Sequence, residues 1–472
     1  MVKEYDLAVI GGGPGGYVAA IRGAQRGARV CLVESDAVGG TCLNRGCIPT
    51  KALYSSARLL RSLRDAANHG IRLGEPVFDF AATVDRKDGV VSQLVGGVAQ
   101  LLKGNGVDLY LGRGFLEGPG RVGIRGQGAV GHLRAKSIIL ATGGRPLVPE
   151  GFAPGGKNVL TSDEFLAIKD LPKSLLIVGG GYIGCEFAGI FSTFGVAVTI
   201  VEQLPALLAR SGRQAVREVE KSFKSAGVKL HLDTAVTDVE TRSDGVHVRL
   251  ANGETLQAEK ILLSVGRRPN SEGLGLEELG VRLERGAVAV DDGMRTNVGG
   301  LYAIGDLTGG WQLAHVASYQ AEIAVENALG GEARADYRVV PSIVFTDPEI
   351  AQVGLTEEQC REQGLAYQVG RFAYLASGMA LCAGEPRGTV KILAEQDGGR
   401  ILGVTIVGAD ASSLIAEASL AMSRKLSAGE LAAGIRAHPS LPEMIKEAAE
   451  DLSGMAVHRL GRAASRRKSS DA

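Results

Sequence analysis

A duplicated strand–turn–helix–strand pattern constrains the fold of this chain more than any other feature. The first copy has an apolar strand at 5–10, the glycine turn 11–16 and a strand at 30–33 that ends in Glu34. The second copy has a strand at 175–178, the turn 179–184 and a strand at 196–201 that ends in Glu202. A G-x-G-x-x-G turn between strand and helix, followed by an acid at the end of the next strand, predicts a dinucleotide-binding unit.

Both copies contain the residue types that dinucleotide recognition requires. The glycines allow a tight turn and a close approach of the pyrophosphate, and the N-terminus of the following helix attracts phosphate groups. The acid accepts a hydrogen bond from a ribose hydroxyl. Because a carboxylate at Glu202 repels a 2′-phosphate, the second copy favours NAD over NADP. One such turn alone also serves ordinary packing, whereas two copies in full context predict two nucleotide sites.

Two cysteines, Cys42 and Cys47, follow the first copy within the run GGTCLNRGCIPTK. On a regular helix, five residues advance by roughly 7.5 Å, whereas the Cα atoms of a disulfide are about 5.5–6 Å apart. A bridge between these cysteines therefore requires a distorted first helical turn, and strained, accessible bridges are the reducible ones. A structural disulfide or a pair of buried thiols is the alternative.

Composition excludes several other classes of protein. The 472 residues predict roughly three domains at about 150 residues each. Lys plus Arg and Asp plus Glu both number 52, so no net charge attracts nucleic acid or an anionic membrane. The apolar segment 175–201 contains six glycines and indicates strand, turn, helix and strand, not a membrane span. The N-terminus leads directly into a strand, so we expect a cytoplasmic protein without a signal peptide.

Eight ordered motifs carry a resemblance to a known family. They are GGTCLNRGCIPTK (39–51), ATGGRP (141–146), GGGYIGCE (179–186), SVGRRPN (264–270), AIGD (303–306), QLAH (312–315), PSIVFTDPE (341–349) and AHPSLPE (437–443). From about Tyr5 to Leu460 the chain resembles the class I FAD-dependent pyridine nucleotide-disulfide oxidoreductases. The resemblance implies an α/β fold with two Rossmann-like domains, for FAD and NAD, and a C-terminal α+β dimerisation domain.

The resemblance also implies domain boundaries and cofactor contacts. We expect an FAD-binding domain in two parts (1–147 and 269–340), an NAD-binding domain (148–268), a dimerisation domain (341–460) and a disordered basic tail (461–472). The implied contacts to FAD are Gly11, Gly13, Gly16, Glu34, Thr41, Lys51, Gly114, Thr142, Gly143, Asp306, Ala314 and His315. The implied contacts to NAD are Gly179, Gly181, Gly184, Glu202, Val236 and Gly266. No metal site is expected.

For the chemistry, the resemblance assigns roles to four charged or thiol groups near the flavin. Cys42 would exchange with the substrate and Cys47 would lie against the flavin, at a helix N-terminus that lowers the pKa of a thiol. Lys51 and Glu186 resemble the family's ion pair beside the flavin, although each could be an ordinary surface charge.

His438 is the candidate acid–base. It precedes Pro439, which disfavours helical geometry and lets the ring project from a loop. Ser440 and Glu443 have the spacing of a capping box that opens a helix. Glu443 is therefore either a cap alone or the carboxylate that orients His438. The resemblance favours orientation of His438, and it implies that this histidine serves the partner subunit of a homodimer.

Within the family, the motifs are most similar to members that oxidise dihydrolipoamide with NAD⁺. The implied partner is a lipoyl domain or lipoyl carrier protein of a 2-oxoacid dehydrogenase or glycine cleavage complex. No nucleic-acid or membrane partner is expected. Arg436 stands where a second histidine is common, Gln320 and Ala321 replace Glu-Gly, and Pro442 replaces Ser. A reductase of another low-molecular-weight disulfide and a non-catalytic flavoprotein scaffold are the alternatives.

Overall fold

The computed structural model describes residues 2–126, 131–154, 156–396 and 399–460, so the predicted tail 461–472 lies outside the described residues. The chain divides into two compact units, each assembled from three segments. The first comprises Met1–Ser55, Asp79–Leu171 and Leu262–Asp336. The second comprises Ser56–Phe78, Pro172–Ile261 and Tyr337–Ala472. Helix α3 (Cys47–Arg64) runs from the first unit into the second.

The first unit is built on a mostly parallel sheet. Its strands are β1 (Lys3–Ile10), β2 (Val30–Glu34), β3 (Asp108–Leu111), β4 (Arg113–Gly118), β5 (Arg121–Arg125), β6 (His132–Leu140) and β19 (Leu301–Ala303). They lie in the order β3-β2-β1-β6-β5-β4, and β19 pairs with β6. The central strand β1 is parallel to both neighbours, with Leu7 opposite Val30 and Ser137. Strands buried on both faces have near-continuous apolar sequences, as β1 and β2 do.

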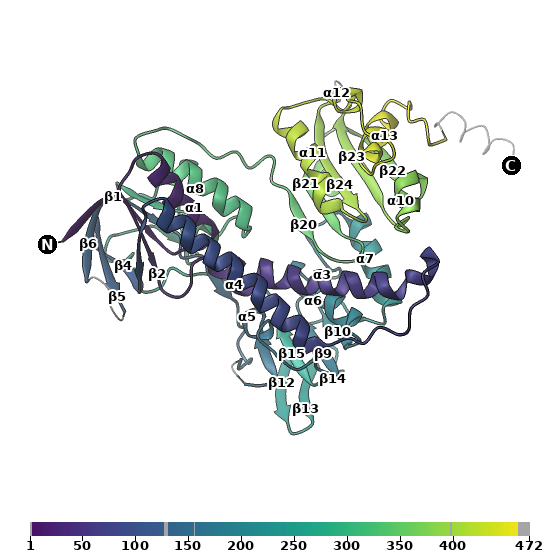
Figure 1. Ribbon diagram of the computed structural model, residues 1–472, viewed down its shortest axis with the longest axis horizontal. Coiled ribbons are helices and arrows are strands. Elements are labelled where there is room, and N and C mark those ends of the chain that lie inside the picture. The colour runs from purple at the N-terminus through teal and green to yellow at the C-terminus, as the bar shows by residue number, and fades with distance from the viewer. Residues whose placement is uncertain (1, 127–130, 155, 397–398, 461–472) are drawn as a thin grey trace. The chain divides into compact units, whose positions relative to one another are not determined.

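Helices and further short strands complete the first unit. The helices are α1 (Pro14–Gln25), α2 (Gly40–Arg45), α4 (Phe80–Gly104), α5 (Ser162–Phe165), α8 (Ala314–Ala328) and the 3₁₀ turn η2 (Gly305–Thr308). The short strands are β7 (Gly144–Pro146), β8 (Val159–Thr161), β16 (Arg267–Pro269), β17 (Leu283–Glu284) and β18 (Ala287–Val288). Figure 1 shows α1 and α8 side by side, although they are far apart in the sequence.

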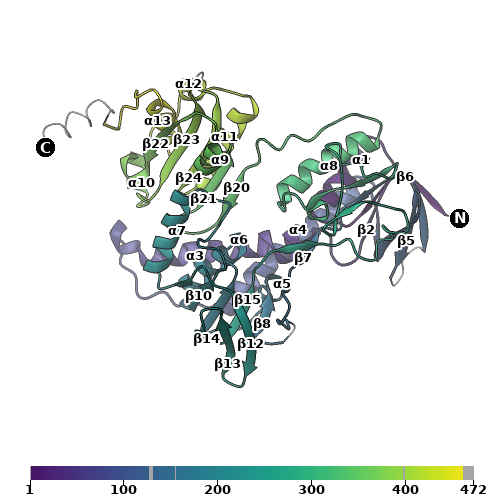
Figure 2. The same ribbon diagram turned by 180° about the vertical axis from the view of Figure 1, so that it is seen from behind.

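The second unit repeats the parallel design. Its strands are β9 (Ser174–Val178), β10 (Ala197–Val201), β11 (Lys229–His231) and β15 (Lys260–Leu263), in the order β11-β10-β9-β15. The same unit contains helices α6 (Tyr182–Thr193) and α7 (Arg213–Ser225) and the 3₁₀ turn η1 (Ala66–His69). It also contains an antiparallel sheet of β12 (Val236–Arg242), β13 (Gly245–Leu250) and β14 (Thr255–Ala258) (Figure 2). Segment 175–201 thus forms β9, α6 and β10. None of the described helices combines the length and apolar composition that crossing a membrane requires.

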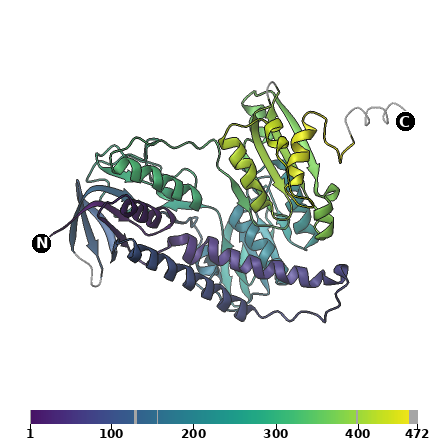
Figure 3. The same cartoon turned by 45° about the horizontal axis from the view of Figure 1, so that its top comes forward.

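The C-terminal part of the second unit is an antiparallel sheet covered by helices. The sheet order is β20 (Ser342–Val344), β21 (Ile350–Gly354), β24 (Ile401–Val407), β23 (Thr389–Glu395) and β22 (Tyr367–Ala373). The helices are α9 (Glu357–Glu362), α10 (Gly378–Cys382), α11 (Ala411–Ser423), α12 (Ala428–Ala433) and α13 (Glu443–Asp451), with the 3₁₀ turn η3 (Tyr374–Ala376). Ile406, Ile415 and Ile445 join strand and helices in one core, and Figure 3 shows α11 and α13 along the sheet. The predicted fold class is confirmed.

Candidate active site

The first glycine turn cannot accept side chains. Gly11 has φ +101°, and a Cβ atom there would lie 2.4 Å from the carbonyl oxygen of Ala141. A Cβ atom on Gly16 would lie 1.7 Å from the carbonyl oxygen of Gly11. Both distances are far below van der Waals contact, so only glycine lets α1 begin this close to the ends of β1 and β6. Pro14 occupies the first turn of α1, where its missing N–H costs no hydrogen bond.

The two strand-end acids are held identically in the two copies. The amide of Gly12 donates to Oε2 of Glu34 at 2.6 Å, and the amide of Gly180 donates to Oε2 of Glu202 at 2.6 Å. The second oxygen of each carboxylate accepts from the amide two residues later, at 2.7 Å for Glu34 and 2.8 Å for Glu202. Each carboxylate is therefore fixed beside its glycine turn, where a bound dinucleotide would present its ribose.

The cysteine segment packs directly on the first glycine turn. The amide of Gly39 donates to the carbonyl of Gly12 at 2.8 Å. Gly40 has φ +55°, and a Cβ atom there would lie 2.5 Å from Cα of Gly13. The backbone of α2 therefore lies against the turn that would hold the pyrophosphate, which places Cys42 within the same local site.

Between the two cysteines the helical path is broken. Helix α2 ends at Arg45, Gly46 has φ −146° and ψ −108°, and α3 begins at Cys47. This interruption supplies the distortion that a bridge between residues five apart requires. In this structure both cysteines are half-buried thiols without a disulfide.

The thiol of Cys42 retains its proton more strongly than an ordinary cysteine. Its hydrogen bond with Cys47 and its burial raise the pKa of the Cys42 thiol well above the usual range, and the charge of Lys51 opposes that shift. The neighbouring sulfur and desolvation outweigh the charge of Lys51 at Cys42, and the lowered thiol pKa expected at the helix N-terminus of Cys47 stays a prediction. The ammonium group of Lys51 therefore acts on the dithiol site, which is the pair of thiols Cys42 and Cys47.

A second backbone turn, after β6, is locked to a distant segment. Thr142 donates through Oγ1 to the carbonyl of Asn270 at 2.9 Å, and Nδ2 of Asn270 donates to the carbonyl of Thr142 at 3.0 Å. The amide of Asn270 donates to the carbonyl of Gly143 at 2.9 Å. Asn270 was not singled out from the sequence, although it ends the SVGRRPN motif. It holds the turn that is expected to contact FAD.

Asp306 is the second residue of η2, three positions after the end of β19 at Ala303. Burial raises the pKa of its carboxyl group, while Arg267, whose Nε is 3.5 Å from Oδ2, favours the ionised form. The preceding amide, that of Gly305, donates to Oε1 of the buried Gln320 at 2.7 Å. Gln320, a departure from the family pattern, thus supports the turn that positions Asp306.

The other sequence-predicted cofactor contacts are dispersed among the elements. Gly114 is buried in β4, Thr41 lies in α2, Ala314 opens α8, and His315 is exposed in its first turn. In the second copy, Gly179 has φ +104°, and no atom lies within 4 Å of a Cβ built on Gly181, where a phosphate would approach. Gly184 is buried in α6, Val236 begins β12, and Gly266 has φ +126°.

Glu186 and Lys51, the predicted ion pair, lie on α6 and α3. Glu186 is buried, with 6% of its surface exposed, and its Oε1 accepts from the amide of Phe345 at 3.1 Å. Glu186 is therefore not an ordinary surface charge. Its pairing with Lys51 stays a prediction.

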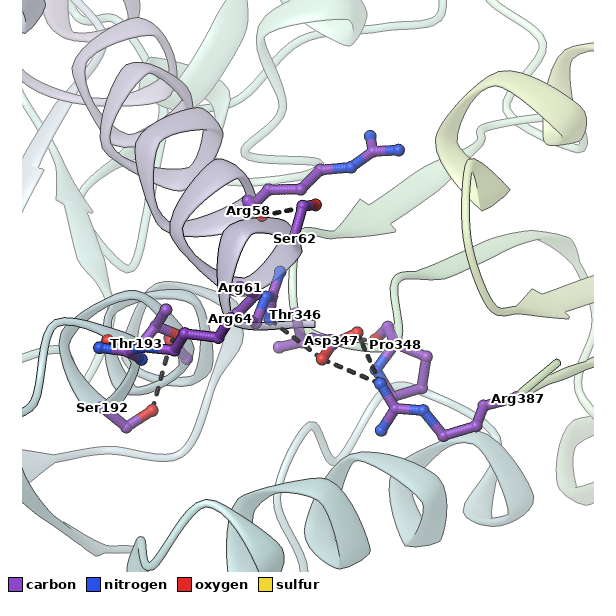
Figure 4. Close-up of polar contacts among 11 residues, drawn as sticks. Arg58, Arg61, Ser62, Arg64, Ser192, Thr193, Thr346, Asp347, Pro348 and Arg387 are labelled. Carbon is purple, nitrogen blue, oxygen red and sulfur yellow. Dashed lines mark hydrogen bonds and ion pairs between the residues drawn. The ribbon is translucent and has the colours of Figure 1, made fainter. Parts of the chain in front are cut away.

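Arginines of α3 fix the C-terminal half of this helix within the second unit. Arg61 lies 3.1 Å from Asp347, and Arg387 contacts both oxygens of the same carboxylate, at 3.2 Å and 3.1 Å (Figure 4). Arg64 donates to the carbonyl of Thr193, the last residue of α6, at 2.8 Å. Sequence reasoning missed these contacts, although Asp347 belongs to a recognised motif.

His438 and Glu443 are in direct contact. Nδ1 of His438 lies 2.8 Å from Oε1 of Glu443, and the amide of Ser440 donates to Oε2 at 2.7 Å. These bonds lower the pKa of Glu443, with the contact to His438 as the largest cause. The side chain of His438 is 81% exposed, so its Nε2 edge is available to a second molecule.

Only one of the two hydrogen bonds of the predicted capping box is present, the one from the amide of Ser440 to Glu443. Helix α13 begins at Glu443 with Pro442 as its N-cap, and no side chain caps it. Ser440 donates its hydroxyl to the carbonyl of Ala437 at 2.5 Å instead of accepting from the helix. Glu443 nevertheless accepts from the backbone as a capping glutamate does, and it orients His438 with its other oxygen.

Arg436, the other notable departure, is engaged inside its own domain. Its guanidinium donates to Glu417 and to the carbonyls of Leu431 and Gly434, and its side chain is 8% exposed. Its charge is already compensated within the domain, so this guanidinium does not require a substrate anion.

The residues present fit two dinucleotides. In each copy the backbone of the turn excludes side chains or leaves open space, and a carboxylate is fixed at the end of the second strand. These features match the close pyrophosphate and the ribose hydroxyl of a Rossmann-type site. Across the described residues, no cluster of three or more His, Cys, Asp or Glu side chains forms a metal site.

Comparison with known proteins assigns the chain to a family. The pyridine nucleotide-disulphide oxidoreductase family matches residues 5–321, and its dimerisation domain matches residues 340–449. The dihydrolipoyl dehydrogenase of Thermus scotoductus is 43% identical over 98% of this chain and 100% of that protein. The dihydrolipoyl dehydrogenase of Halobacterium salinarum is 43% identical over 97% of this chain and 98% of that protein.

Solved structures agree with this assignment. LpdA from Mycobacterium tuberculosis has a TM-score of 0.90 at 30% identity and covers 96% of this chain and 100% of that chain. The HOCl-induced flavoprotein disulfide reductase RclA from Escherichia coli, in its Cu(II) complex, has a TM-score of 0.86 at 30% identity over 95% of this chain and 99% of that one. The match to the dimerisation domain supports a homodimer. With its two glycine turns, its cysteine pair and these full-length relatives, the chain belongs to the pyridine nucleotide-disulphide oxidoreductase family.

Proposed function

We propose that this chain oxidises a protein-bound dihydrolipoyl group to its disulfide, with NAD⁺ as the final acceptor, as a dihydrolipoyl dehydrogenase. The chain is an FAD-dependent disulfide oxidoreductase that uses NAD(H). One observation carries the proposal: the cysteine segment is hydrogen-bonded to the first glycine turn through Gly39 and Gly12, which supports a position of the dithiol beside the flavin nucleotide when FAD is bound. The 43% identical dihydrolipoyl dehydrogenases support this choice of substrate.

Proton transfer at the substrate is the task we propose for His438. Because Nδ1 faces Glu443 at 2.8 Å, Nε2 is the atom left to take a proton from a substrate thiol. The carboxylate keeps the ring in one orientation and stabilises the imidazolium that forms. This arrangement of base and orienting acid suits a reaction that starts with a thiol and requires a thiolate.

Exchange then proceeds through the two cysteines in their disulfide form. The substrate thiolate attacks Sγ of Cys42, the Cys42–Cys47 bond breaks, and Cys47 leaves as a thiolate. The second substrate sulfur attacks the mixed disulfide as a thiolate, and its proton passes through His438 to the departing Cys42, which leaves as a thiol in keeping with the raised pKa of that group. The substrate loses two electrons and the cysteine pair gains them. Bound FAD would supply the two-electron acceptor needed to return the pair to the disulfide, with NAD⁺ as the final acceptor.

The partner arrangement is also part of the proposal. We assign His438 and Glu443 of one subunit to the cysteines of the other, which the dimerisation domain and the exposure of His438 support. A lipoyl domain or lipoyl carrier protein would present the dihydrolipoyl arm to this exposed edge. Reduction of a different disulfide is the second candidate, favoured by the similarity to the disulfide reductase RclA.

Anaerobic turnover of the purified yellow protein with dihydrolipoamide and NAD⁺ tests the proposal, with NADH formation as the readout. We expect rapid NADH formation, much slower formation with NADP⁺ or with reduced glutathione, and loss of activity in Cys47→Ser. Reduction of the flavin by NADH without any reaction of dihydrolipoamide would overturn the lipoyl assignment and direct attention to another disulfide.

A further inference from the structure

Arg267 is a mostly buried cation for which the proposed chemistry has no role. It is the first residue of β16, and its side chain is 12% exposed. Burying a guanidinium is costly unless its donors are paired, so its partners indicate what it does. All of these partners belong to the first unit.

The guanidinium of Arg267 contacts four elements, three of which belong to the candidate site. One terminal nitrogen donates to Oγ1 of Thr41 at 3.3 Å and to the carbonyl of Gly144. Nε lies 3.5 Å from Oδ2 of Asp306, and the other terminal nitrogen lies 3.9 Å from Asp163. The planar fork of arginine reaches such separated acceptors at fixed angles, which a lysine ammonium does not.

Three of these contacts, those to Thr41, Gly144 and Asp306, involve or adjoin groups that are expected to act on the flavin or the substrate. Thr41 precedes Cys42 in α2. Gly144 follows the Thr142–Gly143 turn, and Asp306 is the second residue of η2. A single side chain therefore joins the segment of the substrate-exchanging thiol to two turns that are expected to contact FAD.

We propose that Arg267 is a positioning residue that sets the placement of the Thr41–Cys42 segment relative to the flavin-binding turns. The inference rests on the proposed function, because it concerns the same dithiol site. Arg267 acts through Thr41 and does not touch the reacting sulfur atoms. Displacing a reacting group by about 1 Å can lower a rate by roughly 100-fold. We therefore expect loss of the hydrogen bond between Arg267 and Thr41 to slow thiol exchange at Cys42.

Two substitutions separate positioning from charge compensation. Arg267→Lys keeps a cation near Asp306 but removes the fork that reaches Thr41 and Gly144 together. Thr41→Val removes only the acceptor hydroxyl and keeps a β-branched side chain of similar size. Arg268→Lys, at the exposed neighbouring position of β16, is the matched control.

The experiment uses the FAD-loaded protein and three readouts. The first is NADH formation from dihydrolipoamide and NAD⁺. The second is NADH oxidation by ferricyanide, an acceptor that takes electrons from reduced flavin without the dithiol. The third is the rate at which iodoacetamide alkylates Cys42 in NADH-reduced protein, followed by peptide mass spectrometry.

We expect Arg267→Lys and Thr41→Val to lower dihydrolipoamide turnover at least 10-fold and to change Cys42 alkylation several-fold. Ferricyanide reduction by Arg267→Lys, which changes no expected FAD contact, should stay within about twofold of the parent. Arg268→Lys should match the parent in all three readouts. If Thr41→Val behaves as the control does, or if all activities fall together with loss of FAD, the positioning role is wrong. The parent protein's turnover of dihydrolipoamide tests the proposed function separately, because the alkylation readout does not depend on that substrate.

Discussion

His438 and Glu443 form a charge-assisted pair in which Nδ1 and Oε1 are 2.8 Å apart, on a loop and on the first residue of α13. The other oxygen of Glu443 accepts from the amide of Ser440. The carboxylate is thus held from two sides and in turn holds the imidazole. This geometry leaves the exposed Nε2 edge of His438 in a fixed direction, as a general base requires.

Glu443→Gln is expected to lower kcat/KM for dihydrolipoamide by about 10- to 1000-fold, because a neutral amide stabilises the imidazolium less well. The amide oxygen can still accept from Ser440, so the fold of the loop should persist. Steady-state kinetics checks this prediction, with ferricyanide reduction by NADH as the internal control. Equal loss in both assays would indicate a structural role for Glu443 instead.

Reactivity of Cys42 should respond in opposite directions to its two neighbours. Its hydrogen bond with Cys47 raises the pKa of the Cys42 thiol, and the charge of Lys51 lowers it. Cys47→Ala should therefore lower that pKa and speed alkylation at pH 8, because the reactive species is the thiolate. Lys51→Met, in the reduced protein, should raise the pKa and slow alkylation.

The pH dependence of iodoacetamide alkylation at Cys42 measures both effects. The rate should rise with pH, and the rise should begin at a lower pH in Cys47→Ala than in the reduced parent. Shifts of the same sign in both variants would contradict the arrangement of charges at the dithiol.

Gly16→Ala should abolish FAD binding or prevent folding of the first unit, because the new Cβ would lie 1.7 Å from the carbonyl of Gly11. Gly89→Ala is the matched control, since this position of α4 is exposed and no atom outside its own helix lies within 4 Å of the new Cβ. That change should retain the flavin and stabilise the protein by about 0.5–1 kcal/mol. Flavin absorbance after gel filtration and thermal unfolding check both expectations.

Glu202→Ala should raise the KM for NAD⁺ by about 10- to 100-fold, since a hydrogen bond to a charged group is worth about 1.5–3 kcal/mol. NADP⁺ should be affected less, because the repulsion of its 2′-phosphate disappears together with the carboxylate. The ratio of kcat/KM for the two cofactors is the quantity to compare. Glu34 occupies the equivalent position in the first copy, and Glu34→Ala should weaken FAD while leaving this ratio unchanged.

Local sequence predicted the features that depend on short-range geometry. The glycine turns and their acids were recognisable because each acid stands 22 residues after the glycine whose amide it accepts. The broken helix between Cys42 and Cys47 followed from the span of a disulfide. At Ser440, however, the predicted side-chain cap is wrong, because its hydroxyl donates to the carbonyl of Ala437 in the preceding loop.

What the sequence by itself determined is therefore the two dinucleotide units, the close cysteine pair and the candidate base, since these rest on backbone conformation and residue type over short stretches. Only the tertiary structure decided the partners of the buried charges. The contact of Arg267 with Thr41 joins residues 226 positions apart, and the contact of Glu186 with Phe345 joins residues 159 positions apart. The raised pKa of Cys42 likewise depends on burial and on a neighbouring sulfur. Such effects arise from packing between distant segments, which no local pattern of residues encodes.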